Sequence, residues 1–214
     1  MTTEPRQLLL LLTWMSPAFP TGAFAYSHGL EWAIDTGLVR DGDELRAWIA
    51  DLITRGSGWN DAVLFSRCWE EDASSLNELA LALATSRERH LETSQLGRAF
   101  RIAAGVFAAP ALDEDEIAYP IAAGSACAAM GIDRRDALLA YLQGFAATLT
   151  SVAVRLVPIG QTAGLEVLRD LAPVIARTAE RAATATRDDL GAITIAADIA
   201  AMKHETQRSR VFRT

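Results

Sequence analysis

The chain has 214 residues, of which 50% are hydrophobic and 22% charged, and its formal net charge is −7. This length fits one domain that buries roughly 70% of the surface its unfolded chain exposes, so folding needs no disulfide or metal. Residues 202–214 carry four cations and one carboxylate, a local +3 that leaves −10 on the rest, and such an acidic body argues against nucleic acid, which requires a contiguous cationic surface.

The N-terminal segment is a short apolar run followed by a turn. Residues 8–15 predict a buried helix that stops before Pro17, because the residue preceding a proline is pushed out of the helical region. Arg6, this run and the small residues at 23 and 25 also have the pattern of a secretory signal. The shortness of the run, the acidic Glu4 and a proline-containing spacer weigh against that reading. No segment has the ~20 uninterrupted apolar residues that span a bilayer.

The next elements follow from helical spacing of apolar residues and from capping residues. Serine, aspartate and asparagine mark helix starts, and glycine marks helix ends. These signals predict a helix over 26–34, a helix opened by Asp41 or Asp43 and closed at 56–58, a helix from Asn60 or Asp61 to about 71, a helix opened by Ser74 or Ser75, and a helix over 86–104.

The second half of the chain also reads as helical. The acidic run 113–116 is interpreted as a solvated helix N-terminus, and a helix over the small residues 121–130 must lie against another backbone. The remaining predictions are an end at Gly131, a long helix opened by Asp133 and ending before Pro158, a helix over 162–184 broken or kinked at Pro173, and a last helix opened by Asp188 or Asp189.

Strand signals are missing from this pattern. No alternation runs longer than about five residues, and there is no repeat or low-complexity linker. The predicted fold class is therefore all-α, a single-domain, bundle-like fold of about nine or ten helices. We divide it into a helical domain over 1–201 and a basic tail over 202–214.

Candidate catalytic or metal-ligating residues are few. The three histidines lie more than 60 residues apart, and no hydrolase, metalloprotease or nucleotide-binding motif is present. His204 beside Glu205 could ligate a borderline metal such as nickel, but two ligands alone are a weak signal. Cys68 and Cys127 have apolar or small neighbours, which favours free buried thiols and a reducing compartment. The sequence predicts no catalytic residue, no metal site and no cofactor.

Four separated segments and the C-terminal segment carry distinctive motifs. They are SPAFPTGAFAYSHGLE at 16–31, ETS with GR at 92–98, YP with Gly124 at 119–124, and RLVPIGQT at 155–162 followed by MKHETQRSRVFR at 202–213. In this order they resemble the UreF family of urease accessory proteins. Ala118 departs from the family, in which a histidine often precedes the third motif, and this counts against a metal site there. The resemblance also favours a cytosolic turn over a signal peptide at the N-terminus.

The resemblance implies a helical, non-catalytic, cytoplasmic protein that dimerises. It implies binding to UreD, also called UreH, and to the GTPase UreG, with which the family delivers nickel to apo-urease. The tail resembles the part that becomes ordered on UreD and helps to recruit UreG, with Arg210 making charge-assisted bonds and Phe212 filling a pocket. The expected partner-binding residues are Tyr26, Lys203, His204, Glu205, Thr206, Gln207, Ser209, Arg210, Phe212 and Arg213.

Other readings of the same residues stay open. Arg210 could instead activate the UreG GTPase by stabilising the transferring phosphoryl group in trans. A weaker alternative is a metal carrier that uses His28, His204 or the acidic run 113–116. Around Arg155, a helix C-terminus followed by a helix capped at Thr162 is preferred over partner contact.

Overall fold

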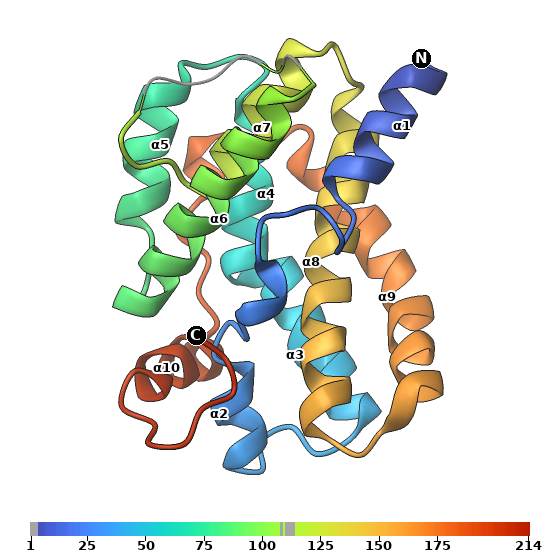
Figure 1. The fold of residues 1–214 in the computed structure, drawn as a ribbon, viewed down its shortest axis with the longest axis vertical. Helices are drawn as coiled ribbons and strands as arrows, with labels where there is room; N and C mark the ends of the chain where they lie inside the picture. Colours follow the sequence, from blue (N-terminus) through green and yellow to red (C-terminus); the bar gives the residue numbers. More distant parts are fainter. Residues whose placement is uncertain (1–3, 108, 110–113) are drawn as a thin grey trace.

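The computed structural model describes residues 4–107, 109 and 114–214, and this part of the chain contains ten α-helices, two 3-10 helices and no strand (Figure 1). The predicted all-α class and the predicted number of helices are confirmed. The elements in chain order are α1 (Pro5–Trp14), η1 (Ala23–Ala25), α2 (Leu30–Asp35), α3 (Gly42–Arg55), α4 (Ser57–Arg67), α5 (Ala73–Ala82), α6 (Arg87–Gly105), α7 (Tyr119–Ala129), α8 (Arg134–Leu156), α9 (Gly160–Ala182), η2 (Arg187–Asp189) and α10 (Ile195–His204).

The helices pack around one continuous hydrophobic core. Helix α8 runs along α9, α9 also covers α3, and α7 packs on both α6 and α4 (Figure 1). Helices α2 and α10 pack against each other at the end of the molecule that carries the C-terminus, while α1 lies near the opposite end. This arrangement brings the first motif of the chain and its closing segment into contact.

Helix α7 confirms the expected close approach of two backbones. Its side chains are small, and a Cβ added to Gly124 would lie 2.7 Å from the carbonyl oxygen of Phe65 in α4. The predicted glycine end at Gly131, with φ +66°, and the predicted cap at Asp133 are also observed. Small residues at this crossing therefore let α4 and α7 bury their facing sides together.

Two helices in the first half begin at other residues than predicted. Helix α2 begins at Leu30, because His28 and Gly29 have φ values of +59° and +77° that a right-handed helix does not accommodate. Helix α4 begins at Ser57, directly after α3, so Gly56 separates the two helices without a linker. Asn60 caps nothing, since its side chain donates to the carbonyl oxygen of Ala192 at 2.8 Å.

Three further boundaries differ from the predictions. Helix α5 is capped by Asp72, whose carboxylate accepts from the Ser75 amide, so neither Ser74 nor Ser75 is the cap. Helix α9 begins at Gly160, which places Thr162 inside it, and continues through Pro173. Asp189 closes a capping box with Thr186 around the single turn η2, and the last long helix starts only at Ile195.

The acidic run does not open a helix. Asp113 lies outside the described residues, and the first turn of α7 contains no acidic residue. Instead, the Asn77 side chain donates to the carbonyl oxygen of Glu116 and accepts from the Ala118 amide, both at 2.8 Å. The interpretation of this run as a helix N-terminus is wrong, because an amide from α5 satisfies the backbone there.

Both cysteines are free, as predicted. Burial raises the pKa of the Cys68 thiol to about 12 and raises that of Cys127 as well. These thiols are therefore poor nucleophiles. Helix α8 is long and apolar enough to span a membrane, but half of its most apolar 18-residue window is buried inside this fold, as in a core helix.

Candidate functional site

The tail begins in a helix. Its first three residues complete α10, so the boundary between residues 201 and 202 falls inside a helix. Residues 205–214 then form a loop that returns to the body beside α2 (Figure 1). The tail is thus built onto the first motif of the chain.

Glu31 of α2 holds the tail backbone. Its carboxylate accepts hydrogen bonds from the amides of Val211 at 2.6 Å and Phe212 at 2.9 Å. The same carboxylate lies 3.1 Å from Nε2 of His204. Glu31 is buried, so its carboxylate loses its hydration on folding. The contacts with the tail amides and with His204 of α10 replace the lost water.

Glu88 of α6 is the second buried carboxylate at the tail. One of its oxygens lies 2.7 Å from Nδ1 of His204, and the other accepts from the Arg210 guanidinium at 2.7 Å. The side chain of Glu205 accepts from the Glu88 amide at 3.3 Å. The tail therefore joins α2 to α6 through two glutamates.

Phe212 is the apolar anchor of the tail, and it is buried in this chain. Its ring is 4% exposed and lies under the Arg155 guanidinium, 4.4 Å from the ring centroid. Arg155 also donates to the carbonyl oxygen of Phe24 at 2.9 Å, and the Arg213 amide donates to that of Ala25 at 2.8 Å. The tail and the first motif therefore close over Phe212 from two sides.

Tyr26 lies in the same contact region and is also buried. Its hydroxyl donates to the side chain of Gln95, which also lies 3.5 Å from the guanidinium of Arg213. Burial raises the pKa of the Tyr26 phenol, so this group remains a neutral donor. Tyr26 is thus linked to Arg213 of the tail through the side chain of Gln95.

The predicted partner-binding residues divide into two groups. Tyr26, His204 and Phe212 face the interior, because the two glutamates and the first motif supply their contacts. Glu205 and Gln207 are partly exposed, whereas Lys203, Thr206, Ser209, Arg210 and Arg213 are exposed. Sequence reasoning missed Glu31, although it ends the first motif, and missed Glu88, which no motif or spacing marks.

Helix α10 adds an apolar face next to the exposed part of the tail. Ile195, Ile199 and Met202 are spaced four and three residues apart, which places them on one side of the helix. Each is at least 44% exposed, and Val211 in the tail is 73% exposed. An apolar stripe bordered by polar and cationic groups is the composition of a protein contact surface.

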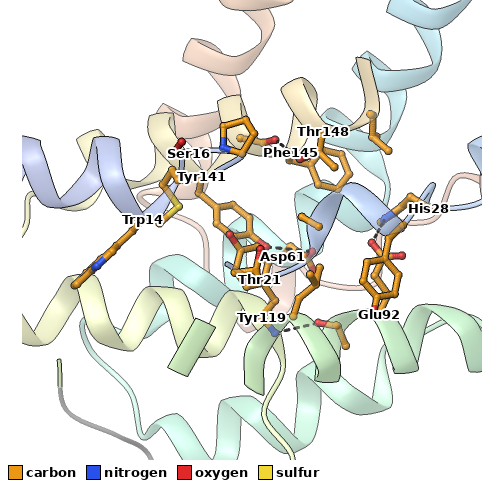
Figure 2. A pocket seen from close by; sticks show the side chains of 18 of the residues that line it. Trp14, Ser16, Thr21, His28, Asp61, Glu92, Tyr119, Tyr141, Phe145 and Thr148 are labelled. Atoms are coloured by element: carbon orange, nitrogen blue, oxygen red, sulfur yellow. Dashed lines mark hydrogen bonds and ion pairs between the residues drawn. The ribbon is translucent and has the colours of Figure 1, made fainter. Parts of the chain in front are cut away.

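A separate cavity of about 70 Å³ lies where α4, α6 and α8 meet the first motif. Figure 2 shows His28, Asp61, Glu92 and Tyr141 around it. Burial would raise the pKa of Glu92, but the guanidinium of Arg89 and the ring of His28 outweigh it and hold that pKa well below its usual range. Burial raises the pKa of Asp61 to about 6.

His28 stands in the order of a hydrolase triad but is enclosed. Its Nε2 lies 2.6 Å from the Ser57 hydroxyl oxygen, and its Nδ1 lies 3.2 Å from the Glu92 carboxylate. The ring is 4% exposed and packs edge-on against Phe145. The cavity beside Ser57 measures about 30 Å³, far below the roughly 300 Å³ or more of a ligand pocket. The geometry therefore serves folding.

Comparison with known proteins decides between a catalytic and an accessory role. The family model described as UreF matches residues 39–172. The chain belongs to the UreF family. It is 46% identical to the urease accessory protein UreF of Brucella ovis over 100% of this chain and 97% of that protein. It is 47% identical to that of Mesorhizobium japonicum over the full length of both, and 46% identical to that of Methylorubrum populi over 96% and 98%.

UreF family proteins are accessory proteins without catalysis. Within the part of the chain that the structure describes, no three His, Cys, Asp or Glu side chains are grouped so that they could hold a metal ion.

Proposed function

We propose that this chain is a cytoplasmic assembly factor for urease that acts as an adaptor. In this proposal it binds UreD and the GTPase UreG, and the complex delivers nickel to apo-urease. Nickel is the cargo, and the chain itself needs no cofactor. Support comes from the family membership and from the name of the relatives, urease accessory protein UreF.

The observation that carries the adaptor proposal is the exposed face of α10 beside the tail. Ile195, Ile199 and Met202 supply an apolar strip, and the exposed cations of the tail border it. An apolar centre excludes water, while cations at the rim steer an acidic partner and fix its orientation. This combination suits a protein partner better than a small molecule.

Within this surface we assign different roles to the two groups of tail residues. The direct contacts are Lys203, Thr206, Ser209, Arg210 and Arg213, with Glu205 and Gln207 at the margin. Tyr26, His204 and Phe212 act from inside by holding the backbone that presents these side chains. Their replacement would change partner binding through the shape of the tail.

Dimerisation is part of the same proposal. The groove between α1 and α8 is apolar and leaves Leu8, Leu12 and Leu139 at least 38% exposed, which supports a further protein contact on the face away from the tail. Measurement of the solution mass tests this part independently, since a monomeric chain would contradict it.

The alternative, activation of the UreG GTPase by Arg210, has less support. The Arg210 guanidinium already donates to the buried carboxylate of Glu88, so a phosphoryl group would have to displace this partner. Removing the arginine would leave Glu88 buried with one partner fewer, which is costly. Arg210 is therefore better suited to a contact at the surface of its own chain than to reaching into another active site.

The adaptor proposal is tested by co-purification with UreD and UreG. Met202→Arg and Ile199→Arg place a charge in the apolar strip, and each should weaken binding about tenfold or more. Leu165→Arg on α9 is the matched control, because Leu165 is 67% exposed and lies on another helix. If all three variants bind like the unmodified chain, α10 is not the partner surface.

A further inference from the structure

Asp61 and Arg89 are interior side chains of opposite charge that do not form a direct ion pair. Asp61 lies in α4 and Arg89 in α6, and both line the cavity of about 70 Å³ and the smaller one of about 30 Å³. Among the residues that the structure describes, Arg89 pairs with Glu92 at 2.5 Å, and no nitrogen of Arg89 lies within 4.0 Å of an oxygen of Asp61. The two charges still act on each other, because burial raises the pKa of Asp61 and Arg89 lowers it.

The arrangement of the helices explains why the two side chains stay apart. Helix α7 packs on both α4 and α6, whereas α4 and α6 make few direct contacts with each other. Asp61 and Arg89 therefore approach the same two cavities from helices whose backbones are separated. Polar groups that face each other beyond hydrogen-bond distance are commonly joined by a water molecule between them.

Both side chains have hydrogen-bonding capacity that the described part of the chain does not use. A guanidinium carries five N–H donors, and an ionised carboxylate has about four acceptor positions. Arg89 is 8% exposed, and the acceptor found for its guanidinium is the Glu92 carboxylate. The donor found for the Asp61 carboxylate is the hydroxyl of Tyr141, at 3.3 Å. Because interior polar groups without partners are costly, the remaining donors and acceptors call for a bound molecule.

The charges around the cavity decide which molecule fits. A cation would be repelled by Arg89, and an anion would be repelled by Asp61 and Glu92. An apolar molecule would leave the N–H groups and the carboxylate without partners. Water both donates and accepts, so one molecule can serve a guanidinium and a carboxylate at the same time. The cavity of about 70 Å³ has room for about two water molecules, each of which takes roughly 30 Å³ in the liquid.

We propose that the cavity is a binding site for structural water, which bridges Asp61 of α4 to Arg89 of α6. The bridging water accepts an N–H from the Arg89 guanidinium and donates to the Asp61 carboxylate. Tyr141 joins α8 to the same carboxylate through its hydroxyl. Bound water thus connects three helices at a point where their backbones leave a gap. This inference concerns the interior of the chain and goes beyond the proposed adaptor function.

A crystal structure of the full-length chain, at a resolution that shows ordered water, tests the bridge directly. A water oxygen should lie within roughly 3.2 Å of a nitrogen of Arg89 and of an oxygen of Asp61. A direct ion pair between Arg89 and Asp61 overturns the proposal. An ion in the place of the water also overturns it, because the argument from charge excludes ions of either sign.

Oxygen-17 magnetic relaxation dispersion then counts long-lived internal water in solution. Asp61→Leu removes the acceptor and fills the cavity, so it should lose at least one such water, whereas Asp61→Asn keeps an acceptor and should retain it. Asp51→Leu is the control, since the Asp51 side chain is 49% exposed and lies on α3. Equal counts in Asp61→Leu and Asp51→Leu overturn the proposal. The unmodified chain needs no variant, and a count of zero there overturns it even if Asp61→Leu does not fold. Neither measurement involves UreD or UreG, so the adaptor proposal stands or falls separately.

Discussion

Gly29 and Ala201 bring the backbones of two distant helices together. A Cβ added to Gly29 would lie 2.6 Å from the amide nitrogen of Ala201, and Gly29 has a φ of +77°. Both conditions select glycine, because a positive φ strains other residues and because a Cβ would collide with the backbone of α10. The contact sets how deeply α10 sits against α2, and hence where the tail begins.

Gly29→Ala should destabilise the fold more than Gly37→Ala. Gly37 has an almost identical φ of +76° but nothing within 4 Å of an added Cβ, so its variant measures the conformational cost alone, about 1 kcal/mol. At Gly29 the backbone of α10 must also move, which adds about 1–3 kcal/mol. Urea denaturation of the two variants measures the difference, and equal midpoints would contradict a steric contact.

Phe212→Ala should cost about 3–5 kcal/mol of stability, as for other buried aromatic side chains. The neighbouring Val211→Ala is the control, because Val211 is 73% exposed and should change stability by no more than about 0.5 kcal/mol. Thermal and urea unfolding of both variants check this. A small loss at Phe212 would mean that the tail is not docked in the isolated chain.

Asp61→Asn should stabilise the protein at pH 7. Burial raises the pKa of Asp61 from about 3.8 to about 6, so the folded state holds this proton more tightly than the unfolded state. The protonated carboxyl of Asp61 therefore adds its full stabilisation of the folded state below pH 3.8, and this stabilisation is lost as pH rises through 6. At pH 7 the ionised carboxylate costs about 2–3 kcal/mol, which the neutral amide avoids.

The measurement for Asp61 is the unfolding free energy between pH 4 and pH 8. The difference between the unmodified chain and Asp61→Asn should grow with pH and level off above pH 7. Asp51→Asn is the matched control, since the Asp51 side chain is 49% exposed and pairs with Arg55 at 2.6 Å. A difference that is constant with pH would show that Asp61 does not titrate in this range.

GTP hydrolysis by UreG distinguishes the adaptor from the activator. With nickel present, addition of the full-length chain should change turnover little, because Arg210 is engaged by Glu88. An activator would raise turnover by orders of magnitude and lose this effect in Arg210→Ala. Arg169→Ala serves as a control arginine, because Arg169 is exposed on α9 and pairs with Asp170 at 2.8 Å.

Much of the fold could be predicted because local signals coincide with the observed elements. Asp41, Ser86 and Asp133 cap helices as their types suggest, and the small residues of α7 announce its close packing. The errors lie where a distant side chain replaces a local signal. Asn77 from α5 binds the backbone of Glu116 before α7, and Asn60 binds the backbone of Ala192 in the loop that precedes α10.

The candidate site was only half predictable for the same reason. The motif at 202–213 pointed to the tail, and the resemblance named its residues. The resemblance could not distinguish exposed from buried tail residues, because burial of the tail depends on Glu31 and Glu88. These glutamates lie 181 and 116 residues away in the sequence from their partners Phe212 and His204. Pairings of this separation leave no periodic trace in a sequence.

These long separations have a consequence for synthesis on the ribosome. Glu31 and Glu88 are made early, but their partners Val211, Phe212 and Arg210 emerge last, since translation proceeds from the N-terminus. Until then the two carboxylates that end up buried lack these partners and must stay hydrated. A prematurely terminated chain would keep this region open and polar, so completion of the fold itself distinguishes finished molecules from truncated ones.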